Sequence, residues 1–312
     1  MTQFPLRSIM VPEEGQRAIG ALLAGARPDI EIVLGADAEP PASPYAVIAF
    51  NPGPVINRFA DAAWVHVAGA GTDKIEAAME FTPPLMTRTL GELGAQIAEY
   101  VLAYVLQRSQ RMAARAQAQA RAEWSKDATQ PRYLNGQRAV IFGTGAIGQE
   151  IALRLTQFGV IVDGVSRSGD AVSPFRQVVR AADWRALEPE TVDIVVLALP
   201  NRPGTRGLIG HEKLSAFRGA QLINIGRGEV LNERALIDAL EAGAISEAAL
   251  DVFATEPLPA SSPLWSHPHV KVTPHVSGLT RPEDTVDAFL AALDALERGD
   301  TPPLLVNPGA GY

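Results

Sequence analysis

The chain contains 312 residues, of which 47% are hydrophobic and 20% are charged, and its formal net charge is −8. That length predicts about two globular domains, and the acidic balance argues against general nucleic-acid binding. Because the sequence has no cysteine, disulfides, thiolate zinc sites and cysteine nucleophiles are excluded.

The start of the chain and its apolar segments indicate where the protein works. Its first ten residues, MTQFPLRSIM, lack the positively charged lead and apolar core of a secretion signal. No apolar run approaches the ~18 residues that are needed to span a bilayer. We therefore expect a cytoplasmic protein with no membrane partner, no nucleic-acid partner and no bound metal.

The first hundred residues alternate short apolar runs with stretches of helical pattern. The runs EIVLG (31–35), YAVIAF (45–50) and WVHVAGAG (64–71) are predicted strands, and the alternation favours a small domain with a parallel sheet. A long helical pattern follows over residues 94–124. Its first half is apolar nearly all round and its second half is rich in Ala, Gln and Arg. We expect one long helix that is buried early and exposed late.

A second series of strands follows the loop at 127–137, which contains Pro and Gly. These segments are short, β-branched and apolar on both faces, as expected for strands covered by helices on two sides. The predicted strands are RAVIFG (138–143), VIVDGVS (160–166), TVDIVVLALP (191–200), AQLINIG (220–226), EAALDVF (247–253) and HVKVTPH (269–275). The tail over 282–300 predicts an amphipathic helix that returns to the first domain.

A glycine-rich turn joins the first strand of this series to a helical pattern. Its glycines are spaced Gly143-x-Gly145-x-x-Gly148, with Ala146 and Ile147 between the last two. The first glycine permits a tight turn, the second lets the backbone approach a pyrophosphate, and the third lets the helix pack on the strand. Free N–H groups at the helix start would bind phosphate. This context favours a dinucleotide site over an ordinary turn.

Three polar residues stand at the ends of predicted strands: Arg227, Glu256 and His275. Ligands of open α/β sheets bind outside the carboxyl ends of the strands. The set suits reduction of a 2-oxo acid, because imidazole can donate the proton and guanidinium can bind carboxylate and carbonyl oxygens. A carboxylate beside the imidazole would orient it and favour its protonated form. Taken singly, each residue also fits a structural role, as a surface ion pair, a solvated loop residue or a buried histidine.

Several stretches resemble the D-isomer-specific 2-hydroxyacid dehydrogenase family. They are GTGAIGQEIALRLTQFG, LPNRPGTRGLI, INIGRG, LDVFATEPLPASSPLW and VTPHVSG, in this order. The similarity runs from about Val65 to about Gly278, and TRT…AEYVL at 87–102 resembles the glyoxylate/hydroxypyruvate reductase branch. The resemblance implies two Rossmann-like, doubly wound parallel-sheet α/β domains, with the cofactor domain inserted into the substrate domain.

The same resemblance implies domain borders and assembly. It places the substrate domain at 1–100 and 280–312 and the dinucleotide-binding domain at 101–279. The long helix and the tail helix would bridge the two across a cleft, and the assembly would be a homodimer.

Roles for individual residues also follow from the resemblance. Arg227 would bind the substrate, His275 would be the general acid/base, and Glu256 would be its partner. Backbone N–H groups of Ala70 and Gly71, in AGAGTD, would hold the substrate carboxylate. The predicted cofactor-binding residues are Gly143, Gly145, Ala146, Ile147, Gly148, Ser166, Arg167, Ser168, Leu199, Pro200, Ile225, Gly226, Arg227, Asp251 (near the nicotinamide carboxamide), His275, Ser277 and Gly278.

The stretch VIVDGVSRSG (160–169) lacks the acid that would hold the adenosine ribose of NAD. That Asp or Glu is expected at the end of the second strand, where Ser166, Arg167 and Ser168 stand, whereas Asp163 falls three residues early. The replacement removes the repulsion of a 2′-phosphate and adds a guanidinium and two hydroxyls. We therefore predict that NADPH is preferred, with NADH as a second cofactor. Alternatively, Arg167 stacks on adenine or points into solvent.

These observations predict an oxidoreductase that transfers a hydride from NADPH to a small 2-oxo acid of the glyoxylate or hydroxypyruvate type, giving a D-2-hydroxy acid. One alternative is an NAD-dependent biosynthetic dehydrogenase of the 3-phosphoglycerate type, against which the missing acid at Ser166 counts. Another is a dinucleotide-sensing, corepressor-like binding protein, which could keep the same motifs. The acidic balance and the lack of a basic tail favour a stand-alone enzyme.

Overall fold

The computed structural model describes residues 6–307, which form two compact units. Unit 1 combines the described residues up to Leu93 with those from Leu279 onward, and unit 2 spans Gly94–Gly278. The assignment of unit 1 to the substrate and of unit 2 to the cofactor stays a prediction. The predicted substrate domain also includes residues 1–5 and 308–312, which lie outside the described residues.

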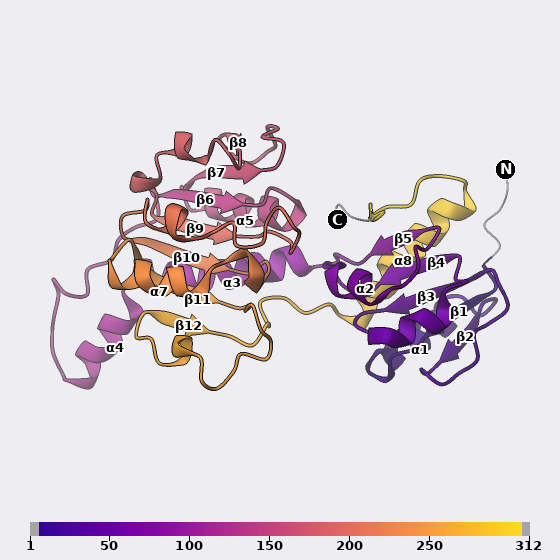
Figure 1. The fold of residues 1–312 in the computed structure, drawn as a ribbon. Coiled ribbons are helices and arrows are strands. Elements are labelled where there is room, and N and C mark those ends of the chain that lie inside the picture. The colour runs from indigo at the N-terminus through magenta and orange to yellow at the C-terminus, as the bar shows by residue number, and fades with distance from the viewer. Residues whose placement is uncertain (1–5, 308–312) are drawn as a thin grey trace. The chain divides into compact units, whose positions relative to one another are not determined.

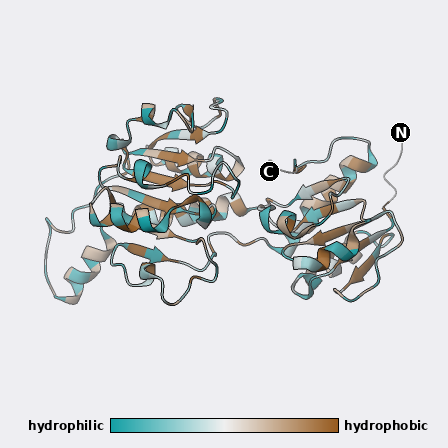
Figure 2. Cartoon of the chain, in the orientation of Figure 1, coloured by the Kyte–Doolittle hydropathy of each residue, from teal (hydrophilic) through white to brown (hydrophobic). Residues whose placement is uncertain are grey.

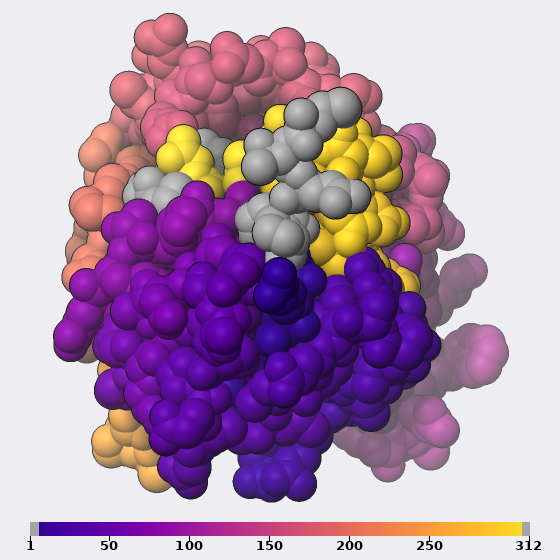
Figure 3. Space-filling model, turned by 90° about the vertical axis from the view of Figure 1, so that its right-hand side faces the viewer, coloured from indigo at the N-terminus to yellow at the C-terminus, as the bar shows by residue number. Residues whose placement is uncertain are grey.

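Unit 1 is built on a parallel five-stranded sheet with the order β2-β1-β3-β4-β5 (Figure 1). Its strands are β1 (Ser8–Val11), β2 (Glu31–Leu34), β3 (Tyr45–Ala49), β4 (Trp64–Val67) and β5 (Met86–Arg88). Its helices are α1 (Arg17–Ala26), α2 (Asp73–Ala78) and α8 (Pro282–Glu297). Phe289 and Leu293 of α8 share a core with Ile19 and Leu23 of α1. Segments from the two ends of the chain therefore lie side by side on this unit, in indigo and yellow (Figure 3).

Unit 2 is built on a parallel seven-stranded sheet with the order β12-β11-β10-β9-β6-β7-β8. Its strands are β6 (Arg138–Phe142), β7 (Ile161–Ser166), β8 (Val178–Arg180), β9 (Ile194–Leu197), β10 (Ala220–Asn224), β11 (Ile245–Leu250) and β12 (Val270–Val272). Its helices are α3 (Leu93–Ser109, which begins at the last residue of unit 1), α4 (Met112–Ala120), α5 (Ala146–Gln157), α6 (His211–Leu214) and α7 (Glu233–Glu241). The chain adds β7 and β8 on one side of β6 and β9 onward on the other, which makes a topological switch point between β6 and β9.

The strands predicted from apolar runs all form, and most of the strands that lie inside the two sheets are brown in Figure 2. Strands β9 and β10 are buried along their whole length, as expected when helices cover both faces of a sheet. The predicted fold class is therefore confirmed. None of the helices within residues 6–307 is long and apolar enough to cross a membrane.

The prediction of one long helix over 94–124 is wrong. α3 ends at Ser109 and α4 starts at Met112, with Arg111 between them at a left-handed φ of 51°. The backbone N–H of Arg132 donates to the Ser109 carbonyl at 2.7 Å, so the returning loop satisfies a carbonyl at the end of α3. Strands β1, β5 and β8 were not among the predicted strands, and β5 and β8 have only three residues each.

His66 is a fully buried histidine on β4 in the core of unit 1. Its Nδ1 lies 2.7 Å from Thr87 Oγ1, and its Nε2 lies 3.0 Å from Thr89 Oγ1. The Trp64 indole N–H also donates to Thr87 Oγ1 at 2.8 Å, and Phe289 packs edge-on against the imidazole. Burial lowers the pKa of His66 to about 3, so the folded protein holds a neutral ring here. His66 is a structural residue.

We expect the free energy of unfolding to fall as the pH drops from about 6.5 toward 3 because of His66. Above pH 6.5 the ring is neutral in both states, and below it only the unfolded chain takes up the proton readily. Each pH unit below the unfolded-state pKa removes about 1.4 kcal/mol, which gives about 2 kcal/mol at pH 5. Urea denaturation at pH 7 and pH 5 measures this. Between pH 7 and pH 5, the free energy of unfolding of the parent should fall by about 2 kcal/mol more than that of His66→Gln. Equal falls in the two proteins would show that His66 does not cause the pH dependence.

Candidate active site

The site residues predicted in unit 2 lie at one edge of its sheet. All strand pairs of this sheet are parallel, so their carboxyl ends share that edge. The predicted catalytic residues follow β10, β11 and β12, and the glycine-rich turn lies at the switch point after β6. The loops after β9, β10 and β12 hold Leu199, Pro200, Ile225, Gly226, Ser277 and Gly278. The strand order thus brings the loops with the predicted catalytic residues, after β10, β11 and β12, next to the loops with the predicted cofactor-binding residues, after β9, β6 and β7.

The glycine-rich turn after β6 leaves no room for a side chain at two of its glycines. Gly143 has a φ of +109°, and a Cβ there would lie 2.4 Å from a backbone oxygen of the loop after β9. A Cβ on Gly148 would lie 2.0 Å from the Gly143 carbonyl oxygen, because α5 packs closely on the turn. Gly145, by contrast, faces open space, and no side chain caps α5. The N–H groups at the start of α5, around Ala146 and Ile147, are therefore placed to bind an anion.

The loop after β7 presents hydroxyl donors. Ser166 Oγ accepts the N–H of Gly169 at 2.9 Å, and Ser168 Oγ accepts the N–H of Asp170 at 3.3 Å. Because the backbone supplies a donor to each oxygen, each hydroxyl keeps its own proton for another acceptor. Arg167 is exposed between the two serines. The end of β7 and the loop after it therefore carry two hydroxyl donors and an exposed guanidinium.

Asp163 is held inside the sheet by two arginines. Its side chain is 1% exposed, and Arg176 donates to it through Nε at 2.8 Å and Nη2 at 2.6 Å. Arg138 Nη2 lies 3.5 Å from the same carboxylate. The carboxylate is thus occupied by ion pairs and cannot replace the acid that is missing at Ser166.

Arg180 is a second guanidinium beside this loop, and sequence reasoning missed it. It lies opposite Ser166 in the register of β7 and β8, and its Nε donates to the Ser168 carbonyl at 3.1 Å. A Cβ on Gly169 would lie 2.9 Å from Arg180 Cγ, so the glycine lets this side chain lie against the loop. No sequence motif marks the short strand β8, so only the pairing register of β7 and β8 shows that Arg180 lies beside Ser166.

His275 and Glu256 form a histidine–carboxylate pair. His275 Nδ1 lies 3.1 Å from Oε1 and 3.0 Å from Oε2 of Glu256. Glu256 Oε1 also accepts the N–H of Phe253 at 3.2 Å, which helps to fix the carboxylate. With Nδ1 engaged, Nε2 is the ring nitrogen left for a substrate, and the His275 side chain is 43% exposed. His275 has a left-handed φ of 57°, an unfavourable conformation for a residue with a Cβ.

Asp251 anchors the loop that carries His275. Its buried carboxylate accepts the N–H groups of Val276 at 2.9 Å and Ser277 at 2.8 Å, and the Thr273 hydroxyl at 2.6 Å. Its backbone carbonyl accepts the N–H of His275 at 2.9 Å. These bonds offset the strained φ of His275 and fix its ring beside Glu256. The predicted contact of Asp251 with a nicotinamide carboxamide stays a prediction.

The loop after β10 holds Arg227 between two close-packed glycines. A Cβ on Gly226 would lie 2.6 Å from the Leu199 carbonyl oxygen, and one on Gly228 would lie 1.8 Å from the backbone after β11. The fully buried Asn224 donates to the Arg227 carbonyl at 3.3 Å and accepts the Gly226 N–H at 3.2 Å. Asn224 was missed from the sequence because it reads as an ordinary strand end. The packing sets Arg227 between the loops after β9 and β11.

Ala70 and Gly71 follow β4 in unit 1, just before α2. The Ala70 carbonyl accepts a hydrogen bond from Arg88 Nη1 at 2.9 Å. The predicted substrate-binding N–H groups therefore belong to a different unit from the catalytic side chains Arg227, Glu256 and His275.

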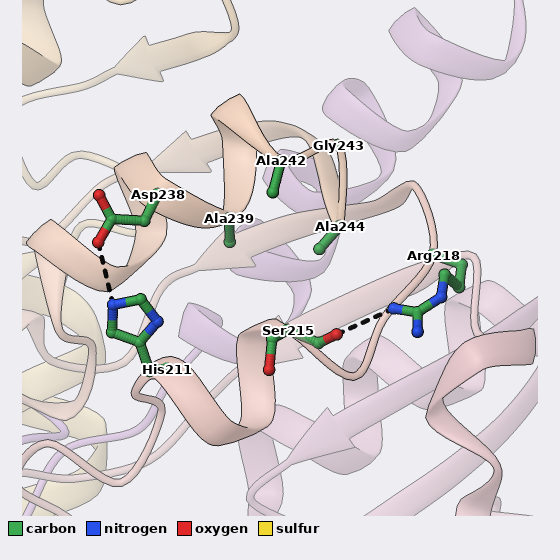
Figure 4. A pocket seen from close by; sticks show the side chains of 8 residues that line it. All are labelled: His211, Ser215, Arg218, Asp238, Ala239, Ala242, Gly243 and Ala244. Atoms are coloured by element: carbon green, nitrogen blue, oxygen red, sulfur yellow. Dashed lines mark hydrogen bonds and ion pairs between the residues drawn. The ribbon is translucent and has the colours of Figure 1, made fainter.

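A hollow of about 330 Å³ lies at the other edge of the unit 2 sheet (Figure 4). Its lining includes Arg218 and Gly243, which precede β10 and β11 and so mark the amino ends of the strands. In it, His211 Nε2 lies 3.0 Å from Asp238 Oδ2. The hollow is thus separate from the predicted site, and His211 is hydrogen-bonded to Asp238 there.

The chain is similar to known proteins in sequence and in fold. Residues 102–277 match the family model described as D-isomer specific 2-hydroxyacid dehydrogenase, NAD binding domain. The chain is 35% identical over 256 residues to a glyoxylate/hydroxypyruvate reductase A from Serratia proteamaculans, covering 80% of this chain and 81% of the relative.

Two solved structures of high similarity were also found. The NADPH-dependent glyoxylate/hydroxypyruvate reductase from Sinorhizobium meliloti, in complex with NADP and sulfate, has a TM-score of 0.88 at 26% identity, covering 98% of this chain and 100% of that one. The D-isomer specific 2-hydroxyacid dehydrogenase from Xanthobacter autotrophicus, in complex with NADPH and MES, has a TM-score of 0.86 at 28% identity, with the same coverage of 98% and 100%.

Proposed function

Because the chain belongs to the D-isomer specific 2-hydroxyacid dehydrogenase family of NAD(P)-dependent oxidoreductases, we propose that it reduces small 2-oxo acids with NADPH. Substrates of the glyoxylate or hydroxypyruvate type would give D-2-hydroxy acids. The observation that carries the proposal is the His275–Glu256 pair at the same sheet edge as Arg227 and the glycine-rich turn. The substrate class is supported by the Serratia relative, which is described as a glyoxylate/hydroxypyruvate reductase.

The side chains divide the work of reduction between them. When bound, the reduced nicotinamide supplies the hydride that the carbonyl carbon accepts. His275 holds a proton at Nε2 and donates it to the carbonyl oxygen, while Glu256 orients the ring and balances its positive charge. Arg227 binds the substrate carboxylate and carbonyl oxygen through its fork of N–H donors. The N–H groups of Ala70 and Gly71 hold the same carboxylate.

The residues around the turn after β6 fit a dinucleotide. Neighbouring backbone atoms leave no room for a side chain at Gly143 or Gly148, and Gly145 faces open space. A pyrophosphate can therefore approach the backbone at this turn. The preference for NADPH rests on the end of β7 and the loop after it, where Ser166 and Ser168 keep hydroxyl protons and Ser166 stands at the position expected for the ribose-binding acid. The NADPH and NADP found in the Xanthobacter and Sinorhizobium structures support this choice.

The NAD-dependent alternative fits the site less well. An NAD-dependent biosynthetic dehydrogenase would need a ribose-binding acid, and Asp163 is occupied by Arg176 and Arg138. A corepressor-like sensor could bind the dinucleotide and keep the His275–Glu256 pair, so turnover of a 2-oxo acid is the measurement that separates it from an enzyme. We therefore retain the hypothesis of a 2-hydroxyacid dehydrogenase.

We further propose that the enzyme works as a homodimer in the cytoplasm. Support for a second copy comes from large apolar side chains on α4 and the segment after it. Met112 is 51% exposed, Trp124 is 97% exposed and Tyr133 is 74% exposed. Large exposed apolar side chains are a feature of protein interaction surfaces.

An assay of the purified protein tests the proposed function. Glyoxylate, hydroxypyruvate, pyruvate and 3-phosphohydroxypyruvate are each mixed with NADPH or NADH, and the loss of reduced-nicotinamide absorbance is followed. We expect glyoxylate or hydroxypyruvate to be reduced faster with NADPH, and hydroxypyruvate to give D-glycerate. Turnover confined to 3-phosphohydroxypyruvate with NADH would favour the biosynthetic alternative. Tight NADPH binding without turnover of any acid would favour the sensor.

A further inference from the structure

Arg88 is a partly buried cation without an ion pair among residues 6–307. It ends β5, an edge strand of the unit 1 sheet, and lies opposite Val67 of β4. Its Nη1 donates to the Ala70 carbonyl at 2.9 Å, while its Nε is buried without a hydrogen-bond partner. Burial lowers the pKa of Arg88. Such a charge is unfavourable for stability alone, so a functional reason for it is worth seeking.

The bond from Arg88 fixes the orientation of the Ala70–Gly71 peptide. In a trans peptide the C=O and N–H groups point in opposite directions, so holding the Ala70 oxygen turns the Gly71 N–H away from Arg88. A peptide that precedes glycine can rotate at low cost, and the Arg88 bond opposes that rotation. Donation to the carbonyl oxygen also polarises the peptide and strengthens its N–H as a donor.

We propose that Arg88 is a positioning residue for the carboxylate-binding loop. It locks the Ala70–Gly71 peptide with its N–H presented to the substrate carboxylate, and its unneutralised charge adds attraction for that carboxylate. The inference rests on the proposed function, which assigns the carboxylate of a 2-oxo acid to the N–H groups of Ala70 and Gly71. Arg88 differs from Arg227 in acting on the substrate through a peptide group.

Two substitutions of Arg88 distinguish the contribution of its charge to substrate binding from that of its planar guanidinium. We expect Arg88→Met to raise the KM for glyoxylate roughly 10- to 100-fold, the value of a charge-assisted contact, with kcat and the Kd for NADPH little changed. Arg88→Lys should recover part of the loss, because it keeps the charge but not the planar fork. The Tm of Arg88→Met should stay close to that of the parent, because removal of a partly buried charge offsets the loss of the hydrogen bond to the Ala70 carbonyl.

Arg58→Met is the matched control. Arg58 also lies in unit 1 and donates to backbone carbonyls, but to those of Ala36 and Ala38 after β2 and not to that of Ala70. Its KM for glyoxylate should equal that of the parent. A fall in the Tm of Arg88→Met with an unchanged KM would assign Arg88 a structural role and overturn the proposal.

Calorimetric titration with oxalate in the presence of NADPH separates this proposal from the proposed function. If the parent reduces 2-oxo acids and Arg88→Met binds oxalate as tightly as the parent does, the proposed role of Arg88 is wrong and the proposed function is supported. If the parent reduces no 2-oxo acid but binds oxalate, the proposed function is wrong, and weaker oxalate binding by Arg88→Met would still support the role of Arg88. A parent that neither reduces a 2-oxo acid nor binds oxalate would overturn both.

Discussion

We expect His275→Gln to lower kcat for 2-oxo acid reduction by about 10²–10⁴-fold, the usual contribution of a positioned general acid. The amide can keep a hydrogen bond to Glu256, which lies 3.0 Å from Nδ1, but it cannot transfer a proton at neutral pH. The loop geometry should survive, because Asp251 binds the backbone of this loop and not the imidazole. Stopped-flow or steady-state assays at saturating NADPH measure the loss, and fluorescence titration should show unchanged NADPH binding.

His211→Gln is the matched control for this variant. His211 also pairs with a carboxylate, Asp238 at 3.0 Å, but at the opposite edge of the same sheet. Its kcat should remain that of the parent. Near-normal turnover by His275→Gln would remove His275 from the mechanism, and an equal loss in both variants would point to general damage to unit 2.

Glu256→Gln should lower kcat less than His275→Gln does. The replacement keeps an oxygen near Nδ1 and the bond from the Phe253 N–H, but it removes the negative charge that balances the imidazolium. A loss of about 10- to 100-fold corresponds to a charge-assisted bond replaced by a neutral one. Turnover equal to that of the parent would mean that the carboxylate only packs against the ring.

The strand-end positions of the site could be predicted, because they depend on local pattern. An apolar strand followed by Gly143-x-Gly145-x-x-Gly148 fixes the turn, and parallel strands bring their carboxyl ends to one edge. Arg227, Glu256 and His275 follow from the same rule, and their predicted roles rest on side-chain chemistry and on the family resemblance together.

Other features depend on strand order and register, which no short motif encodes. The bonds from the His275 loop to Asp251 require β11 and β12 to be neighbours, and Arg180 meets Ser166 only through the pairing of β7 with β8. The end of α3 at Ser109 likewise depends on a bond from Arg132, which is distant in sequence. The helical pattern of the sequence therefore predicted one continuous helix, whereas tertiary contacts end α3 at Ser109.

Cofactor preference should change most on substitution of the loop after β7. We expect Arg167→Ala to raise the KM for NADPH by roughly 10- to 100-fold, the range of a charge-assisted contact of about 1.5–3 kcal/mol, and to leave the KM for NADH little changed. Arg185→Ala, which removes another exposed guanidinium of unit 2, is the control and should change neither constant.

Ser166→Asp should go further than Arg167→Ala, because it acts on both cofactors in opposite directions. The new carboxylate repels the 2′-phosphate of NADPH and supplies the acceptor that the ribose hydroxyls of NADH lack. The Gly169 N–H, which now donates to Ser166 Oγ at 2.9 Å, can hold the new side chain at the strand end. The effect on NADPH should shrink with added salt, since exposed charges are screened over about 8–10 Å. A parent that already prefers NADH at saturating 2-oxo acid would refute this account, because Ser166, Ser168 and Arg167 would then serve no 2′-phosphate.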